Sequence, residues 1–578
     1  MMDKKLHLKY FWILAAVCLV SLFLFLGKSD FHTKGEPREA VVAFAMLDMD
    51  NWTLPITNGT DMAYKPPMFH WMIAAISTVT GAVTEYTSRM PSAIALAVMV
   101  LAGYLFYSRR RGSGVAFLAS LIALTNFEVH RAGMNCRVDM LLAAMMVLAL
   151  FQLYKWGEKG LKGVPLLGIL CLSGAFLTKG PVGLVLPCAV VAVFMWIRGM
   201  NFFRIFFSFL WVVLAACIIP AFWYYAAWKQ GGEQFLALVL EENVLRFLGK
   251  MTYSSHENPW PSNVMTVITG FVPYTILLVM SLFTLRYTRI AAKPAQWWNR
   301  FRTWIREMDD TRLFSFLSIA IMFVFYCIPK SKRSVYLLPI YPFIAYFIAE
   351  YVIWLVKYRP RSVKWFNATL CVLALVLTSI FAAVRCGLVP HTILEGKHAD
   401  ENLAFLNALE TIPLGLELLI ILLPAAVAAW YFWSRNKGDE KFRKLRLTYT
   451  GVAVTVAIFF ALDGVYQPAV LNVKSNKPQA ARIAEAVPEG TIYSYIANPV
   501  KGNRLHHFTL NFYLGNRIVP FIDFAPEDGY VLIGKKQYGI FMEDYGGKYE
   551  LEPVPGIEFK SNDTKDITNL YKFNLKQL

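Results

Sequence analysis

Residues 10–26 read YFWILAAVCLVSLFLFL, a run with no charged side chain. A run of this length, with aromatic residues near its start, is typical of a helix that spans the hydrocarbon core of a membrane. Lys4, Lys5 and Lys9 precede it, as basic residues precede the apolar region of a signal peptide. Because no small-residue cleavage site follows, we interpret the segment as an uncleaved membrane anchor.

The composition extends this interpretation to the whole chain of 578 residues. Hydrophobic residues make up 57% and charged residues 17%, whereas soluble domains average about 45–50% and about 25%. These figures exclude an ordinary soluble enzyme and a disordered chain. A net charge of +18 would suggest nucleic acid binding in a soluble protein, but in a membrane protein it indicates basic cytoplasmic loops. The eight cysteines form no CxxC or Cys/His metal spacing.

Apolar segments recur along the chain, and we predict thirteen membrane spans. With the N-terminus in the cytoplasm, the inner segments hold 28 Lys and Arg and the outer loops hold 16, in agreement with the positive-inside rule. An odd number of spans then places the C-terminus on the outer face. The predicted spans are residues 10–26, 91–107, 112–127, 138–154, 164–177, 180–197, 205–227, 264–285, 313–328, 335–356, 365–384, 414–433 and 447–462.

Two regions differ from these spans. Residues 66–81, PPMFHWMIAAISTVTG, are apolar but short, and we place them along the outer surface as an interfacial helix of the first outer loop, 28–90. From residue 471 the pattern changes to a predicted helix at 478–486, followed by the strand-like runs TIYSYI, HFTLNFYL, RIVPFID, GYVLIG and YGIFMED. We therefore predict a mainly α, polytopic membrane domain at 1–470 and a small soluble α/β domain at 471–578 on the outer face.

Four outer segments carry charge beside the membrane, where ions are costly unless they are paired or used. One interpretation is that each cation binds lipid headgroups or anchors its helix. Four such segments on one face favour a joint role, since Arg and Lys bind phosphate oxygens and a carboxylate accepts a proton from a nucleophile. The segments are residues 34–67, HRAGMNCRVD at 130–139, LTKGPVG at 177–183 and PKSKRSVYLLPIYP at 329–342.

Five blocks of sequence resemble, in order, the family that contains the aminoarabinose lipid A transferases and the protein O-mannosyltransferases. The resemblance covers about residues 1–350, and VKSNKPQAARIAE at the start of the outer domain also fits. It implies the GT-C membrane glycosyltransferase fold and the transfer of a sugar from a polyprenyl-phosphate carrier to an acceptor on the outer side. The blocks are EPREAVVAFAMLDMDNWTLPITNGTDMAYKPPMFHWMIA, RAGMNCRVDMLL, GAFLTKGPVGLVLP, LEENVLRFLGKMTYSSHENPW and KSKRSVYLLPIYPFIA.

The resemblance assigns roles to residues of the first loop. It makes Glu36 one of the two acidic residues that open the family motif, whereas the preceding aspartate, the family's proposed base, is Gly35 here. The base is therefore expected to be Glu36 or, in the second outer segment, Asp139. Arg38 and Lys65 match cations that the family uses on the donor phosphate.

Other cations complete the predicted site. Lys179 and Arg333 are expected to join the donor-phosphate site, although Lys179 could equally anchor the end of a span. Arg333 is favoured because it is crowded by neighbouring lysines, and like charges repel unless an anion compensates. The candidate contacts to donor or acceptor are Arg131, Arg246, Lys330, Lys332 and Tyr336.

A metal site is weakly supported by the residues present. The resemblance places the metal of the aminoarabinose transferases between a glutamate and a histidine. The glutamate is replaced here by Tyr64, and the histidine matches His256. His256 is thus the one candidate ligand for a divalent zinc or magnesium ion, and as a residue of a polar loop it is more often solvated.

These features predict an integral glycosyltransferase of the bacterial inner membrane with a cytoplasmic N-terminus and a periplasmic C-terminal domain. It would move an aminoarabinose- or hexose-type sugar from polyprenyl phosphate to lipid A or another envelope glycolipid. A phosphate acceptor is already ionised and needs less help from a base than a hydroxyl, so the missing aspartate favours it. The alternatives are protein O-mannosyltransferase-type glycosylation of Ser or Thr, a lipid-linked sugar flippase, and an inactive relative. Besides donor and acceptor, we expect membrane lipids as partners and no nucleic acid.

Overall fold

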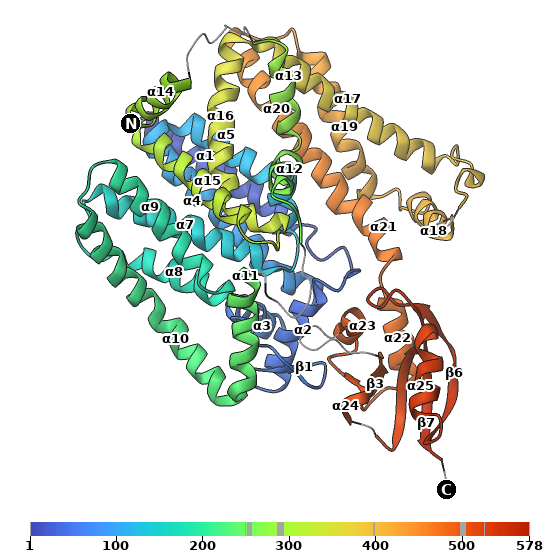
Figure 1. The fold of residues 1–578 in the computed structure, drawn as a ribbon. Helices are drawn as coiled ribbons and strands as arrows, with labels where there is room; N and C mark the ends of the chain where they lie inside the picture. Colours follow the sequence, from blue (N-terminus) through green and yellow to red (C-terminus); the bar gives the residue numbers. More distant parts are fainter. Residues whose placement is uncertain are drawn as a thin grey trace.

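The chain folds into a body of long helices with a small sheet-containing domain at one end (Figure 1). In Figure 1 the first loop, with α2 and β1, lies at the end of the helical body that faces this domain. The computed structural model describes residues 2–248, 250, 257–285, 294–396, 399–497, 505–524 and 526–576.

Among the residues described, nine helices or continuous helical segments are long and apolar enough to cross a membrane. This confirms a mainly helical, polytopic membrane protein. The segments are α1 (Met2–Phe23), α4 (Glu85–Arg111), α7 (Val138–Glu158), α10 (Phe202–Leu240) with η1 (Glu241–Leu245), α15 (Asp310–Cys327), η2 (Ser334–Ile340) with α16 (Tyr341–Tyr358), α17 (Pro360–Arg385), α19 (Leu416–Ser434), and α20 (Glu440–Ala461) with η4 (Leu462–Tyr466) and α21 (Gln467–Val473).

Two further apolar stretches are bent pairs of helices. α5 (Ser113–Thr125) and α6 (Phe127–Gly133) meet at 69°, and Asn126 between them caps α6 by accepting a hydrogen bond from the Val129 backbone. α12 (Pro261–Gly270) and α13 (Tyr274–Leu282) meet at 101°. If each pair is one span, the described residues hold up to eleven spans.

The expected count of thirteen spans is therefore too high by this criterion of length. The other two predicted spans are α8 (Leu166–Lys179) and α9 (Val182–Ile197), with 14 and 16 residues. A full span needs roughly 20 residues. Gly180, with φ of 85°, ends α8, and Pro181 follows directly at the N-cap of α9, so the apolar run is divided into two short helices.

The segment predicted as the first outer loop is compactly folded. It contains α2 (Pro37–Asp48), an antiparallel pair formed by β1 (Ile56–Thr57) and β2 (Asp61–Met62), and α3 (Met68–Thr80). At 13 residues, α3 is shorter than a span, as expected for residues 66–81. The helix ends at Gly81, which has the left-handed conformation common at helix C-termini.

The C-terminal domain is built on a five-stranded mixed sheet of order β4-β3-β5-β7-β6. β3 pairs parallel with β4 and β5, whereas β7 pairs antiparallel with β5 and β6. Two apolar clusters, formed by residues from 480 onward, pack on this sheet. The elements are α22 (Lys477–Ala486), β3 (Ile492–Tyr495), α23 (Phe508–Tyr513), β4 (Ile518–Pro520), α24 (Phe521–Phe524), β5 (Asp528–Gly534), α25 (Lys535–Tyr545), β6 (Tyr549–Lys560) and β7 (Ile567–Leu575).

The strand predictions for this domain were correct only in part. α22 and strands β3, β4 and β5 are confirmed, but HFTLNFYL forms α23 and YGIFMED lies in α25, because short apolar runs do not distinguish helix from strand. β6 and β7 were not predicted. β6 contains Pro553 and Pro555 among charged residues. Such a sequence is tolerated because β6 lies at the edge of the sheet.

Two peripheral helices complete the membrane part. α14 (Pro294–Glu307) precedes α15 and leaves Trp297, Trp298 and Trp304 exposed. Arginines share the helix with these tryptophans, a composition typical of a helix that lies in the membrane interface. α18 (Ala399–Glu410) and the short η3 (His391–Ile393) connect α17 with α19.

Candidate active site

A cavity of about 450 Å³ opens where the first loop meets the ends of several helices. Its wall combines residues 25–36 with parts of α4, α6, α7, η2 and η4. Residues that are distant in sequence, including the predicted Glu36, Arg131, Asp139 and Arg333, thus share one cavity. The Asp, Glu and Arg residues that line it are Glu36, Arg89, Arg131, Arg137, Asp139, Arg333 and Asp463.

The carboxylate of Glu36 is held on both oxygens. Arg89 donates from Nε to Oε1 at 2.8 Å and from Nη2 to Oε2 at 3.1 Å, and the Cys136 backbone N–H donates to Oε1 at 2.9 Å. Burial raises the pKa of Glu36, but the charge and hydrogen bonds of Arg89 outweigh it and leave the pKa below its ordinary value. Glu36 is therefore an ionised carboxylate that joins the first loop to α4.

Asp139 lies in the first turn of α7 and is 5% exposed. Its Oδ1 pairs with the ammonium of Lys179 at the end of α8. That ammonium also lies 4.4 Å from the centre of the Tyr336 ring, a cation–π contact. Arg137 and Arg333 are the next cations that act on the Asp139 carboxylate. Asp139 is thus the carboxylate at which several predicted cations converge.

A second cluster lies on α2 and the loop before α3. Arg38 donates from Nη2 to Oε1 of Glu39 at 3.0 Å, and His70 Nε2 lies 2.9 Å from the other oxygen of Glu39. Burial raises the pKa of Glu39, but the charges of Lys65 and Arg38 and the His70 bond bring it well below its ordinary value. Glu39 therefore carries the negative charge that balances these cations.

Lys65 connects the two clusters. The like charge of Arg38, with burial as the next cause, lowers the pKa of Lys65 to about 8, and Lys179 adds to this effect. Arg38 and Lys179 therefore both act on Lys65, and Lys179 in turn pairs with Asp139. Crowded cations of this kind bind an anion well, because the anion relieves their mutual repulsion.

The lowered pKa of Lys65 predicts that the binding of a phosphate ligand depends on pH. Its folded pKa is depressed, so the ammonium is charged below about pH 8 and loses its proton above that value. We expect the affinity for a polyprenyl phosphate to begin to fall as the pH approaches about 8, where half of Lys65 has lost its proton, and to fall further at higher pH. The second ionisation of the phosphate, at about pH 6, lies below this range. Titration of ligand affinity across this range measures the effect.

A Lys65→Arg variant is the matched control, because a guanidinium stays protonated throughout this range. The fall above pH 8 should disappear in this variant even if its absolute affinity differs. An unchanged fall in Lys65→Arg would assign the titration to another group.

The remaining predicted contacts have separate environments. Arg131 Nη2 pairs with Glu128 at 2.7 Å. Lys332 is buried and donates to the Pro329 carbonyl at 2.6 Å, whereas Lys330 is exposed, so the three cations at 330–333 do not share one environment.

Arg246 begins α11 (Arg246–Leu248) and pairs with Glu242 at 2.7 Å. The same Glu242 accepts a hydrogen bond from Tyr64 at 3.2 Å and also acts on Arg38 and Lys65. Arg246 is thereby joined to the cluster around Lys65.

The predicted metal ligand, His256, lies outside the described residues. Within the part of the chain that the structure describes, no group of three or more His, Cys, Asp and Glu residues is placed to hold a metal ion.

Several charged residues of the site were not predicted from the sequence. Arg89 holds Glu36, His70 contacts Glu39, and His130 Nε2 lies 2.6 Å from Oδ2 of Asp463 in the cavity wall. Asp463 could have been noticed, because an acidic residue directly after an apolar run is a functional candidate. The partners of Glu36 and Glu39 have no local sequence signal, since they are brought close only by folding.

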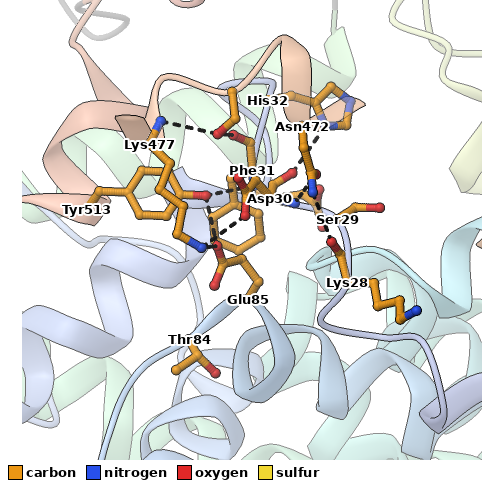
Figure 2. A network of polar contacts seen from close by, with 12 residues as sticks. Lys28, Ser29, Asp30, Phe31, His32, Thr84, Glu85, Asn472, Lys477 and Tyr513 are labelled. Atoms are coloured by element: carbon orange, nitrogen blue, oxygen red, sulfur yellow. Dashed lines mark hydrogen bonds and ion pairs between the residues drawn. The ribbon is translucent and has the colours of Figure 1, made fainter. Parts of the chain in front are cut away.

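The C-terminal domain holds the segment that forms one wall of the cavity. We call residues 26–36 the strap. Figure 2 shows Tyr513 and Lys477 of the C-terminal domain against the strap and Glu85: the Tyr513 hydroxyl accepts from the Phe31 backbone at 2.9 Å and donates to Glu85 at 2.9 Å. Lys477 pairs with Glu85 at 3.0 Å. The C-terminal domain thus supports the strap on one side while the strap lines the cavity on the other.

Known proteins resemble this chain over most of its length. The family described as dolichyl-phosphate-mannose-protein mannosyltransferase matches residues 64–225. An undecaprenyl phosphate-alpha-4-amino-4-deoxy-L-arabinose arabinosyl transferase of Shewanella sediminis is 25% identical over 399 residues, 67% of this chain and 68% of that protein. A second such transferase, from Proteus mirabilis, is 26% identical over 350 residues, and the match spans only 59% of its length.

The fold is also that of a solved structure. ArnT from Cupriavidus metallidurans bound to undecaprenyl phosphate superposes with a TM-score of 0.70 over 97% of both chains, at 18% identity. The helical body, the folded first loop and the C-terminal sheet therefore have the GT-C fold of that structure. The fold, the family match over residues 64–225 and the curated relatives together indicate a polyprenyl-phosphate-sugar-dependent glycosyltransferase similar to the aminoarabinose transferases.

Proposed function

We propose that the protein transfers an aminoarabinose- or hexose-type sugar from undecaprenyl phosphate to lipid A or another envelope glycolipid at the outer face of the bacterial inner membrane. In this orientation the N-terminus is cytoplasmic and the C-terminal domain periplasmic. The relatives named for undecaprenyl phosphate aminoarabinose support the donor, and the same donor lipid is bound in the ArnT structure.

The observation that carries the proposal is the cluster of Arg38, Lys65 and Lys179 beside Asp139. When the glycosidic bond to the carrier breaks, negative charge grows on the departing phosphate. Cations already fixed at that position stabilise the charge without reorganisation, which is usually the largest contribution to catalysis. We assign these three cations to the donor phosphate. Arg333, which was also expected there, lines the cavity and acts on Asp139, and we assign it to the cavity instead.

Asp139 is the base that the geometry favours, because both oxygens of Glu36 are committed to Arg89 and Cys136. Asp139 lines the cavity and pairs with Lys179 through Oδ1, so it can accept a proton from an acceptor that enters the cavity. Tyr336, over which Lys179 lies, keeps that ammonium in place.

An Asp139→Asn variant separates the acceptor classes. With a hydroxyl acceptor, loss of the base should lower transfer roughly 100- to 10,000-fold. With an ionised phosphate acceptor no proton has to be removed, and the loss should be nearer tenfold, from the weakened hold on Lys179. Asp528→Asn, an exposed residue at the start of β5, is the control. Unchanged transfer to both acceptors would exclude Asp139 from the mechanism.

The decisive experiment on the function is mass spectrometry of the envelope of a deletion strain. Loss of one pentose- or hexose-type mass from lipid A or another glycolipid, restored by the wild-type gene and not by Lys65→Ala, is the expected result. Loss of a sugar from envelope proteins alone would favour the second candidate, protein O-glycosylation, which the match of residues 64–225 to the mannosyltransferase family supports. An unchanged envelope would contradict both.

A further inference from the structure

The charges that line the cavity do not balance. Within the described residues, each carboxylate of the wall has its own partner: Glu36 pairs with Arg89, Asp139 with Lys179, and Asp463 with His130. A second arginine of the wall, Arg131, is paired with Glu128.

Two arginines of the same wall have no counter-ion in the part of the chain that the structure describes. The guanidinium groups of Arg137 and Arg333 make no hydrogen bond or ion pair there, although both are partly buried and both act on Asp139. A partly buried cation without a partner is costly. Two of them in one cavity therefore indicate that an anion completes the site.

Gly35 permits the position of Arg137. A Cβ atom built on Gly35 would collide with Nη2 of Arg137, and the guanidinium lies against this buried glycine. Gly35 is also the position at which the related transferases are expected to carry an aspartate. In this chain, the absence of that side chain thus removes a carboxylate and leaves room for the guanidinium of Arg137, which lines the cavity.

We propose that Arg137 and Arg333 form an oxyanion site in the cavity, and that it binds a phosphate-type group of the acceptor. The assignment of the anion to the acceptor rests on the proposed function, whereas the existence of the anion site does not. Arginine suits the role because its planar donors match two oxygens of a phosphate. Gly35 is then a specificity-determining position, since it allows Arg137 to reach the cavity.

Equilibrium binding of radiolabelled inorganic phosphate to the full chain in phosphatidylcholine nanodiscs tests the proposal. The protein is first saturated with undecaprenyl phosphate, so that the cations around Lys65 are occupied. Wild type should then bind one further phosphate. Arg137→Gln and Arg333→Gln should each weaken it roughly 10- to 100-fold, the loss expected for a charged hydrogen bond. Arg482→Gln, on the exposed surface of α22, should bind as wild type does.

Two substitutions at Gly35 test the mechanism without removing an arginine. Gly35→Ala should weaken phosphate binding because its methyl group displaces the guanidinium, and Gly35→Asp should abolish it because it supplies an internal counter-ion. Gly114→Ala is the matched control, since a Cβ there meets no atom within 4 Å. Thermal unfolding confirms that each variant is folded, and Gly35→Asp should be at least as stable as wild type.

Three experimental results would each contradict a different part of the proposal. Phosphate binding that is insensitive to Arg137, Arg333 and Gly35 would overturn the oxyanion site. If phosphatidylglycerol in the nanodisc blocked phosphate while a soluble phosphorylated glycan did not compete, the site would hold a lipid headgroup and the acceptor assignment would be wrong. A wild type that binds phosphate at this site but has no affinity for undecaprenyl phosphate would instead contradict the proposed function and leave the anion site intact.

Discussion

Lys179→Met is expected to lower the turnover of sugar transfer roughly 100- to 1,000-fold, the cost of removing one fixed donor from a developing oxyanion. Lys179 is the cation that pairs with Asp139, lies over Tyr336 and acts on Lys65. Methionine has a similar length without the charge, so packing at the end of α8 should be retained. Single-turnover measurements with saturating donor isolate this step.

The affinity for undecaprenyl phosphate should fall much less than the turnover, because the extra phosphate charge develops only as the bond to the sugar breaks. Lys179→Arg keeps the charge and should recover a measurable part of the rate. Lys162→Met, on an exposed lysine that precedes α8, is the control and should leave turnover unchanged. Equal losses of affinity and turnover in Lys179→Met would mean that Lys179 only binds the ground state.

Arg89→Ala is expected to reduce the free energy of unfolding by about 3–5 kcal/mol, the usual cost of leaving a buried partner unpaired. The side chains of Arg89 and Glu36 are 4% and 6% exposed. Arg89 also donates to the backbone carbonyls of Leu26 and Ser29, so its loss releases the strap. Unfolding in a denaturing detergent, followed by tryptophan fluorescence, measures the change. The exposed pair of Lys444 with Glu440 supplies a control, and Lys444→Ala should have no measurable effect.

The same ion pair decides the role of Glu36. Glu36→Gln and Arg89→Gln should each destabilise the protein, whereas the double variant should recover part of the stability, because no unpaired charge is left buried. If Glu36 only holds the strap, activity should recover together with stability. A stable double variant without activity would assign Glu36 to the chemistry, as the resemblance to the family implied.

The sequence was sufficient to predict the class of fold and most of the cations that the structure places at the candidate site. Long uncharged runs separate membrane spans from loops because the membrane core excludes polar backbone and charge, and this property is local. The hydropathy pattern located the helices, including the short α3. It gave too many spans, because α8 and α9 are apolar yet shorter than a span. The strand-like runs at α23 and α25 were misassigned for a related reason: in a short run, tertiary packing decides between helix and strand.

The pairing of charges was decided only by the tertiary structure. The sequence predicts that Glu36, Asp139 and Lys179 lie on the outer side, but it does not predict the contact of Glu36 with Arg89 or of Asp139 with Lys179. His130 and Asp463 meet across 333 residues. A buried ion takes whichever partner folding brings within a few ångströms, because the interaction depends on distance in space. Hydropathy and motif spacing can be read from the sequence, whereas the partner of each buried charge cannot.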